Sequence, residues 1–271
     1  MSAISPEDEA AIEATKAPLM EHLVELRKRI VWSLVSFGAA FLVCFFFAKD
    51  IYLFLEGPLA HALKGEANQR LIYTALPDVF FTYVKVGMFA GLGVSFPLIA
   101  AQLWMFVAPG LYKHEKSAFL PFLVATPVMF LMGAAFVYYV LLPFAIKFFL
   151  SFETMGTATT LPIQLQARVN EYLDFVMTLI IVFGLCFQLP VLLSLLGRVG
   201  IITSQQLRSV WRYAVVGIVG VAAIITPPDP LSMMSLVVPL VALYGVSILC
   251  VMLIERGRAK REAEREKSSS A

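Results

Sequence analysis

Long uncharged runs of mostly hydrophobic residues alternate along the chain with short clusters of charged residues. A helix needs about 20 apolar residues to cross a hydrocarbon core about 30 Å thick, so runs of this length are typical of transmembrane helices. The pattern therefore predicts six spans. The runs are Ile30 to Ala48, Val86 to Tyr112, Ser117 to Ile146, Phe175 to Gly197, Tyr213 to Pro228 and Pro230 to Ile254.

The fifth run is shorter than the others. From Tyr213 to Thr226 it covers only about 20 Å at about 1.5 Å per residue. The turn Thr226-Pro227-Pro228-Asp229-Pro230 separates it from the sixth run, because proline neither continues a helix nor donates to its hydrogen bonds. We therefore expect a short fifth span, with Arg212 extending toward water or the bilayer thinning around it.

Prolines inside the predicted spans indicate kinked helices in a curved, open-sided bundle, since neighbouring helices satisfy the carbonyl groups that proline leaves free. The fold class predicted is thus an all-α integral membrane protein. The prolines concerned are Pro97, Pro121, Pro127, Pro143, Pro190 and Pro239.

Composition and charge agree with a membrane protein of defined orientation. Hydrophobic residues make up 59% of the 271 residues and charged ones only 15%, against roughly 25% charged in soluble domains. The positive-inside bias places both termini in the cytoplasm. We expect a cytoplasmic segment (1–29) with an amphipathic helix, a membrane domain (30–254) and a charged cytoplasmic tail (255–271). Only six of the 21 basic residues fall on the opposite side: Lys49, Lys64, Lys85, Lys147, Arg70 and Arg168.

The start of the chain is not typical of a cleaved signal peptide, because its polar lead is long and acidic at first. The absence of a transit-peptide composition favours a bacterial protein. The loops 49–78 and 150–167 contain apolar residues, so they either fold over the helix ends as a cap or form ordinary interfacial segments. Lys85 is expected to reach the interface or to pair with Asp78.

Two charged segments on the predicted cytoplasmic side could bind a cationic ligand. In the first, Glu21 and Glu25 lie one helical turn apart just before the first span. On spacing alone, the simpler interpretation is an ion pair between Glu25 and Arg29 at i,i+4. In the second, Glu115 lies among Lys113, His114 and Lys116, where a solvated turn is the simpler interpretation.

The predicted spans contain few polar groups. Gln188 lies in the middle of the fourth span, where a buried amide either has a function or joins helices by hydrogen bonds. No carboxylate lies in the middle of a span, which argues against a small-solute transporter, the alternative function considered. An intramembrane protease is also disfavoured, because no histidine lies near Ser95 as a base. We expect no catalytic, cofactor or metal site.

Several short motifs together resemble the TatC family, whose members are the largest subunit of the twin-arginine protein translocase. They occur in the order that the family shows, over roughly residues 19 to 255. The motifs are His22-Leu23-x-Glu25-Leu26-Arg27-x-Arg29, Phe80-Phe81-Thr82, Ser95-x-Pro97, Gln102-x-Trp104-x-Phe106-x-Ala108-Pro109-x-Leu111-Tyr112-x-His114-Glu115, Phe187-x-x-Pro190 and Thr226-Pro227-Pro228-Asp229.

The resemblance implies a receptor in the bacterial inner membrane that binds signal peptides with paired arginines and exports folded proteins. A carboxylate matches the planar fork of a guanidinium, which suits Glu25 and Glu115 to recognition. The other binding residues expected are Phe106, Leu111 and Tyr112 at the entrance, with Glu21 and His22 as helpers.

The resemblance also implies a concave scaffold with protein and lipid partners. These are single-span subunits of the TatA and TatB type, membrane lipid and further copies of the chain, but no nucleic acid. The family carries Glu or Gln at Gln188, which we expect to contact partner helices from a polar groove. Asp229 matches a family position, and it either acts directly or only holds the proline turn by local hydrogen bonds.

Overall fold

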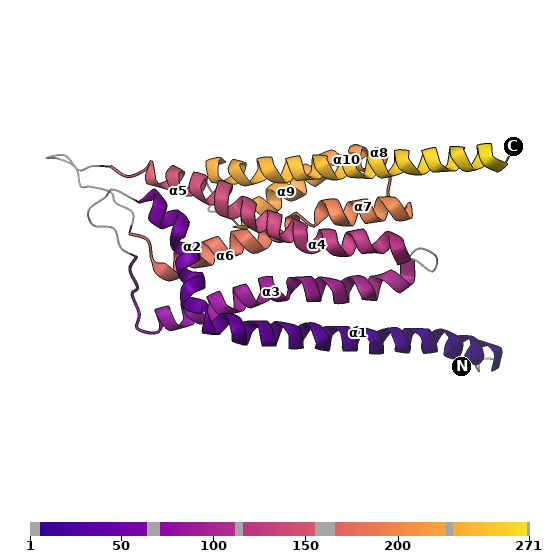
Figure 1. Ribbon diagram of the computed structural model, residues 1–271, viewed down its shortest axis with the longest axis horizontal. Coiled ribbons are helices and arrows are strands. Elements are labelled where there is room, and N and C mark those ends of the chain that lie inside the picture. The colour runs from indigo at the N-terminus through magenta and orange to yellow at the C-terminus, as the bar shows by residue number, and fades with distance from the viewer. Residues whose placement is uncertain (1–5, 64–70, 112–115, 155–165, 226–229, 270–271) are drawn as a thin grey trace, which may run out of the picture.

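The protein is mainly helical in the part described by the computed structural model, which covers the backbone of residues 6–63, 71–111, 116–154, 166–225 and 230–269 (Figure 1). Side chains are described for residues 20, 22–63, 71–106, 121–154, 166–225 and 233–260. The helices are α1 (Pro6–Phe46), α2 (Ala48–Ala62), α3 (Asp78–Leu111), α4 (Lys116–Phe136), the π-helix η1 (Val137–Leu141), α5 (Leu142–Leu150), α6 (Val169–Cys186), α7 (Leu189–Val199), α8 (Ser204–Ser209), α9 (Trp211–Ile225) and α10 (Pro230–Ser269).

Five helical stretches are long and apolar enough to cross a membrane, and the shorter α9 makes a sixth. Each corresponds to one predicted run, so the predicted six-span, open-sided bundle is confirmed. The helix that contains the first span begins well before Ile30, because Arg and Lys continue the helix while their charged ends reach toward water. The five long stretches are His22–Phe46, Asp78–Phe106, Pro121–Leu150, Val169–Val199 and Met233–Lys260.

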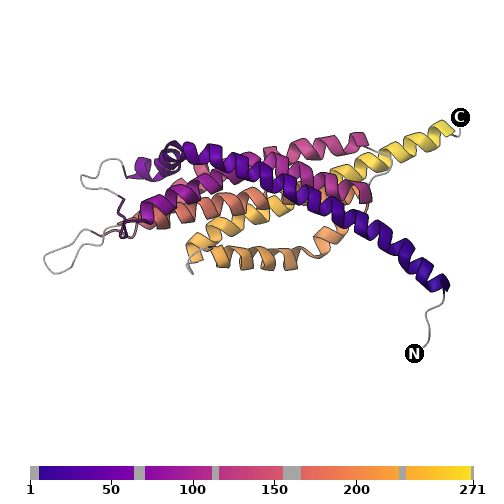
Figure 2. The same ribbon diagram turned by 90° about the horizontal axis from the view of Figure 1, so that it is seen from below.

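Both termini lie at the same end of the bundle, as an even number of spans requires (Figures 1 and 2). We call this the N/C end; α3 ends and α4 begins there (Figure 1). The opposite end, which holds α2, is called the α2 end (Figure 1). α1 runs without interruption from Pro6 through the first span to Phe46.

Glycines let α1 and α3 approach closely near the α2 end. A Cβ atom on Gly91 would lie 2.8 Å from Cα of Phe41, and one on Gly87 would lie 3.1 Å from Cα of Phe45. Both glycines are therefore required to be small by the neighbouring backbone. Most of the remaining surface of α1 consists of exposed apolar side chains such as Leu34 and Val43, which suit contact with lipid.

Two of the predicted proline positions coincide with interruptions of a span. η1 ends two residues before Pro143, whose missing N–H leaves the carbonyl of Tyr139 without its usual helical donor. α6 ends at Cys186 and α7 begins at Leu189, immediately before Pro190. The third and fourth spans are therefore segmented rather than straight.

The α2 helix covers the helix ends, which supports the cap rather than the ordinary interfacial segment. Pro58 lacks an N–H, so the carbonyl of Phe54 has no helical donor; the Tyr138 hydroxyl donates to it instead at 2.7 Å. The Tyr172 hydroxyl donates to the carbonyl of Leu55 at 3.1 Å. Two spans thus hold α2 through its backbone.

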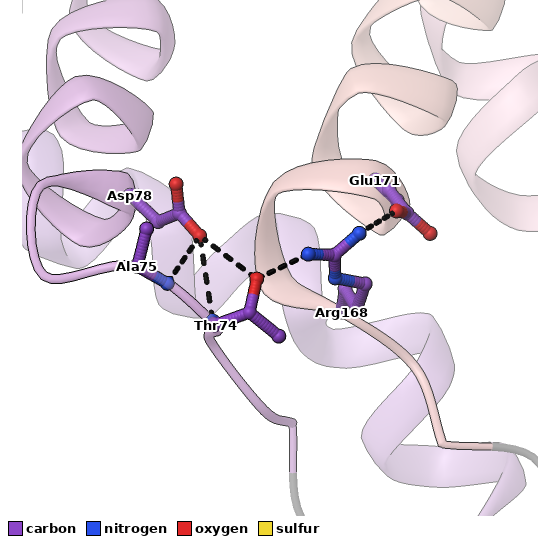
Figure 3. Close-up of polar contacts among 5 residues, drawn as sticks. All are labelled: Thr74, Ala75, Asp78, Arg168 and Glu171. Carbon is purple, nitrogen blue, oxygen red and sulfur yellow. Dashed lines mark hydrogen bonds and ion pairs between the residues drawn. The ribbon is translucent and has the colours of Figure 1, made fainter.

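An arginine cluster joins two connections at the same end (Figure 3). Arg168 donates to Glu171 at 2.7 Å and to the hydroxyl of Thr74, while Asp78 accepts from the backbone N–H of Ala75 at 3.0 Å. Ile72 pairs with the backbone around Arg168 in an isolated parallel bridge. The residues before α3 are therefore tied to those before α6.

Of the two alternatives expected for Lys85, the pairing with Asp78 is wrong. Lys85 Nζ instead contacts both carboxylate oxygens of Asp174, at 2.9 and 2.6 Å. Asp78 is already used as an acceptor by the turn before α3, whereas Asp174 on α6 faces Lys85 across the helix contact.

Candidate functional site

A charged cluster connects α1 to α3 at the N/C end. Arg29 donates from Nη2 to Oε1 of Glu25 and from Nη1 to Oε1 of Gln102, both at 3.1 Å. Nη1 also lies 3.7 Å from the sulfur of Met105. The predicted i,i+4 pair is present, and the cluster extends it to a second helix.

The cluster is only partly shielded from solvent. The Arg29 side chain is 28% exposed and that of Glu25 is 32% exposed. Nε of Arg29 is buried and has no hydrogen-bond partner among the described residues.

An aromatic stack also joins α1 to α3. The rings of His22 and Phe106 lie 4.3 Å apart between centroids at an interplanar angle of 16°. His22, Glu25 and Arg29 recur every three or four residues and so share one face of α1. The stack brings that face against the end of α3.

An apolar groove of about 430 Å³ runs between α1 and α3 directly beside the cluster. Arg29, Ser33 and Gln102 provide its polar groups, and the remaining lining is hydrophobic. We call the cluster and the groove together the α1–α3 site. The groove is lined by Leu26, Arg29, Ile30, Ser33, Leu34, Phe37, Leu92, Ile99, Gln102, Leu103 and Phe106.

A second polar cluster lies inside the membrane domain. The indole N–H of Trp104 donates to the hydroxyl of Thr126 at 2.8 Å, and the amide nitrogen of Gln188 donates to the carbonyl of Thr126 at 3.0 Å. Gln188 is 8% exposed, and its Oε1 has no partner among the described residues. The hydrogen bonds join α3, α4 and the break between α6 and α7, so the amide links helices, as one of its two interpretations predicted.

The family model of the Sec-independent protein translocase protein (TatC) matches residues 21–239. The chain is 44% identical to a Sec-independent protein translocase protein TatC of Magnetococcus marinus over 251 residues, which cover 93% of this chain and 90% of that protein. The chain belongs to the TatC family.

Relatives and solved structures of the family extend the comparison. A chloroplastic TATC protein of Arabidopsis thaliana is 38% identical over 240 residues, covering 88% of this chain and 67% of that one. A crystal structure of the twin-arginine translocase receptor TatC matches with a TM-score of 0.73 at 33% identity, covering 86% of this chain and 99% of that chain. A second, obtained in the detergent DDM, gives 0.74 at 34% identity, with coverage of 84% and 98%.

The TatC-family chain is therefore a multi-pass membrane protein and a core subunit of a twin-arginine translocase, acting within a Tat complex. The alternative of a small-solute transporter is not supported, because the relatives and the structural neighbours are translocase components.

The structure describes only part of the residues predicted to bind the signal peptide. It brings Glu25, His22 and Phe106 together in the α1–α3 site. Glu21 and Leu111 lie in α1 and α3, but their side chains fall outside the described residues, as do Tyr112, Glu115 and Asp229 altogether.

The contacts of Arg29 with α3 were not predicted from the sequence. Gln102 begins one of the motifs that resemble the TatC family, and Met105 follows it at i+3, so both face the same side of α3. The i,i+3 spacing of Gln102 and Met105 was the signal in the sequence that pointed to a shared face of this helix. It could not identify the partner helix, because Arg29 and Gln102 are separated by 73 residues.

Proposed function

We propose that this TatC-family chain is the receptor for signal peptides with paired arginines, and that the α1–α3 site binds them. A guanidinium of the peptide donates to Glu25, and the hydrophobic segment that follows enters the apolar groove. The single observation that carries the proposal is the placement of a partly exposed carboxylate at the edge of an apolar groove. One site thereby offers a partner for the guanidinium group and a partner for the hydrophobic segment of such a peptide.

The residues outside the described part complete this proposal. Glu115, which directly precedes α4 in the sequence, supplies the second carboxylate, and Leu111 and Tyr112 contribute apolar contacts. Glu21 and His22 act as helpers. The excess of Lys and Arg at the N/C end supports a cytoplasmic location of this end in the bacterial inner membrane.

Partner binding forms the other part of the proposal. Single-span subunits of the TatA and TatB type dock against exposed apolar helix surface, and further copies of the chain join the receptor complex. α9 suits such docking, because its buried residue is Ala222 and it exposes Tyr213, Val216 and Ile224. Gln188 and Asp229 remain candidate contacts for these partners.

Crosslinking of a signal peptide tests the receptor function. A peptide carrying paired arginines and a photoreactive group is added to membranes containing the full chain, with a paired-lysine peptide for comparison. We expect Glu25→Gln to reduce crosslinking at least tenfold, because the acceptor for the charge-assisted hydrogen bond is removed. Glu171→Gln is the matched control, since Glu171 is an arginine-paired glutamate at the α2 end. Equal crosslinking of the native chain and Glu25→Gln would contradict the proposed site.

A further inference from the structure

Arg29 holds the carboxylate that the proposed function assigns to the signal peptide. We propose that Arg29 is an internal competitor for Glu25, which an arginine of the peptide has to displace. The inference rests on the proposed function and adds a residue that sets the affinity of the site. It is carried by the contacts of Arg29 with two helices rather than by its charge alone.

The guanidinium of Arg29 already provides what a peptide guanidinium would provide. Its Nη2 donates to Oε1 of Glu25 at 3.1 Å, a single charge-assisted hydrogen bond that is longer than the usual range of about 2.7–2.9 Å. Its Nη1 donates to Gln102 on α3 at the same distance. Because this second bond anchors the guanidinium across the helix contact, Arg29 is more than a freely rotating surface partner of Glu25.

The contact is nevertheless replaceable. Both side chains are partly exposed, so water can reach the carboxylate from one side. The buried Nε of Arg29 has no partner among the described residues, and a buried unpaired donor is unfavourable. When a peptide guanidinium takes its place, one guanidinium–carboxylate bond is exchanged for another. Arg29 can retain its bond to Gln102 or turn toward water.

The local charge gives this competition its effect. Residues 22–30 contain one carboxylate, Glu25, and three basic side chains, Arg27, Lys28 and Arg29. Of these cations, Arg29 makes the ion pair with Glu25. A peptide arginine that approaches the site therefore meets a carboxylate whose charge is largely compensated, and release of Arg29 is part of the free energy of binding.

Displacement has a distinctive consequence for selectivity. The cost of releasing Arg29 is the same for every ligand that uses Glu25, so it lowers the affinities of paired-arginine and paired-lysine peptides by the same factor. Removal of Arg29 should then strengthen binding of both peptides and leave their ratio unchanged. A partly exposed ion pair of this kind corresponds to a factor of about two to five.

The experiment measures equilibrium binding of a fluorescent signal peptide to the purified full chain in lipid nanodiscs. Arg29→Met keeps the length and apolar contacts of the side chain but removes its charge. Lys28→Met is the matched control, because it removes an adjacent positive charge. We expect Arg29→Met to lower Kd about two- to fivefold and Lys28→Met to change it by a smaller factor. If Arg29→Met does not fold, Arg29→Gln decides the same question.

The outcomes separate this inference from the proposed function. Loss of binding in Glu25→Gln together with unchanged or weaker binding in Arg29→Met would overturn the competitor role and leave the receptor site in place. Equal tightening by Arg29→Met and Lys28→Met would also overturn it, because general charge repulsion would then explain both. Binding that is indifferent to Glu25→Gln would remove the proposed site, and the competitor role with it.

Discussion

Two arginine clusters of similar composition lie at opposite ends of the bundle. Arg29 pairs with Glu25 four residues earlier and reaches Gln102 on another helix. Arg168 pairs with Glu171 three residues later and reaches Thr74 in another connection. In both, Nε is buried without a partner among the described residues. The composition of an arginine cluster therefore does not show whether it binds a ligand.

The surroundings of the two clusters differ. Around Arg168 the backbone itself is paired: the N–H of Ile72 donates to the carbonyl of Ala167 at 3.1 Å, and that of Val169 to the carbonyl of Ile72 at 3.0 Å. Around Arg29, side chains join α1 and α3 beside an apolar groove. A cluster fixed by backbone hydrogen bonds suits a structural role, whereas one held by side chains beside a groove can exchange its partner.

The largest effect is expected from Gly91→Ala, which disturbs the α1–α3 site without touching its polar groups. The added methyl would lie 2.8 Å from Cα and 2.9 Å from N of Phe41, so the helices must separate. We expect a loss of about 1–3 kcal/mol in the free energy of unfolding, and weaker peptide binding. Thermal unfolding in detergent and the peptide-binding assay measure the two effects.

Gly93→Ala is the control for this prediction. A Cβ atom on Gly93 would meet nothing within 4 Å, so the substitution should leave stability unchanged or raise it slightly. If the two alanine variants behave alike, the close approach of α1 and α3 does not determine the geometry of the site.

A smaller effect is expected from Arg168→Met at the α2 end. The variant leaves Glu171 and Thr74 without their shared donor, at an expected cost of about 1–2 kcal/mol in the free energy of unfolding. Peptide binding at the opposite end should stay within twofold of the native value. Lys49→Met, which removes an exposed positive charge at the same end, serves as the control. A large loss of peptide binding in Arg168→Met alone would show that the two clusters are coupled.

The smallest effect is expected from Tyr138→Phe, which removes one hydroxyl from the cap. The carbonyl of Phe54 already lacks a helical donor because of Pro58, and the variant would also remove the hydroxyl that replaces this donor. We expect a loss of about 0.5–1.5 kcal/mol, measured by thermal unfolding. Tyr139→Phe is the neighbouring control, because that side chain is 69% exposed. Identical unfolding temperatures for both variants would show that α2 does not depend on this bond.

The sequence was sufficient to predict the spans and the local ion pair, but not the contacts between distant residues. Hydropathy and helical spacing are local properties, and they predicted the short fifth span and the Glu25–Arg29 pair. The partner of Lys85 was missed because Asp174 is 89 residues away. The Arg168–Thr74 contact spans 94 residues. Such contacts depend on how helices cross, which the sequence pattern of one helix does not specify.

A tilt of α1 about its close contact with α3 would be amplified at the charged cluster. This close contact lies where Phe41 meets Gly91, and Glu25 is 16 residues away along the helix, or about 24 Å at about 1.5 Å per residue. A tilt of about 5° about this contact would move Glu25 by about 2 Å over this distance. Arg29 lies on the same stretch of α1 and Gln102 lies on α3, so such a tilt would lengthen the bond between them.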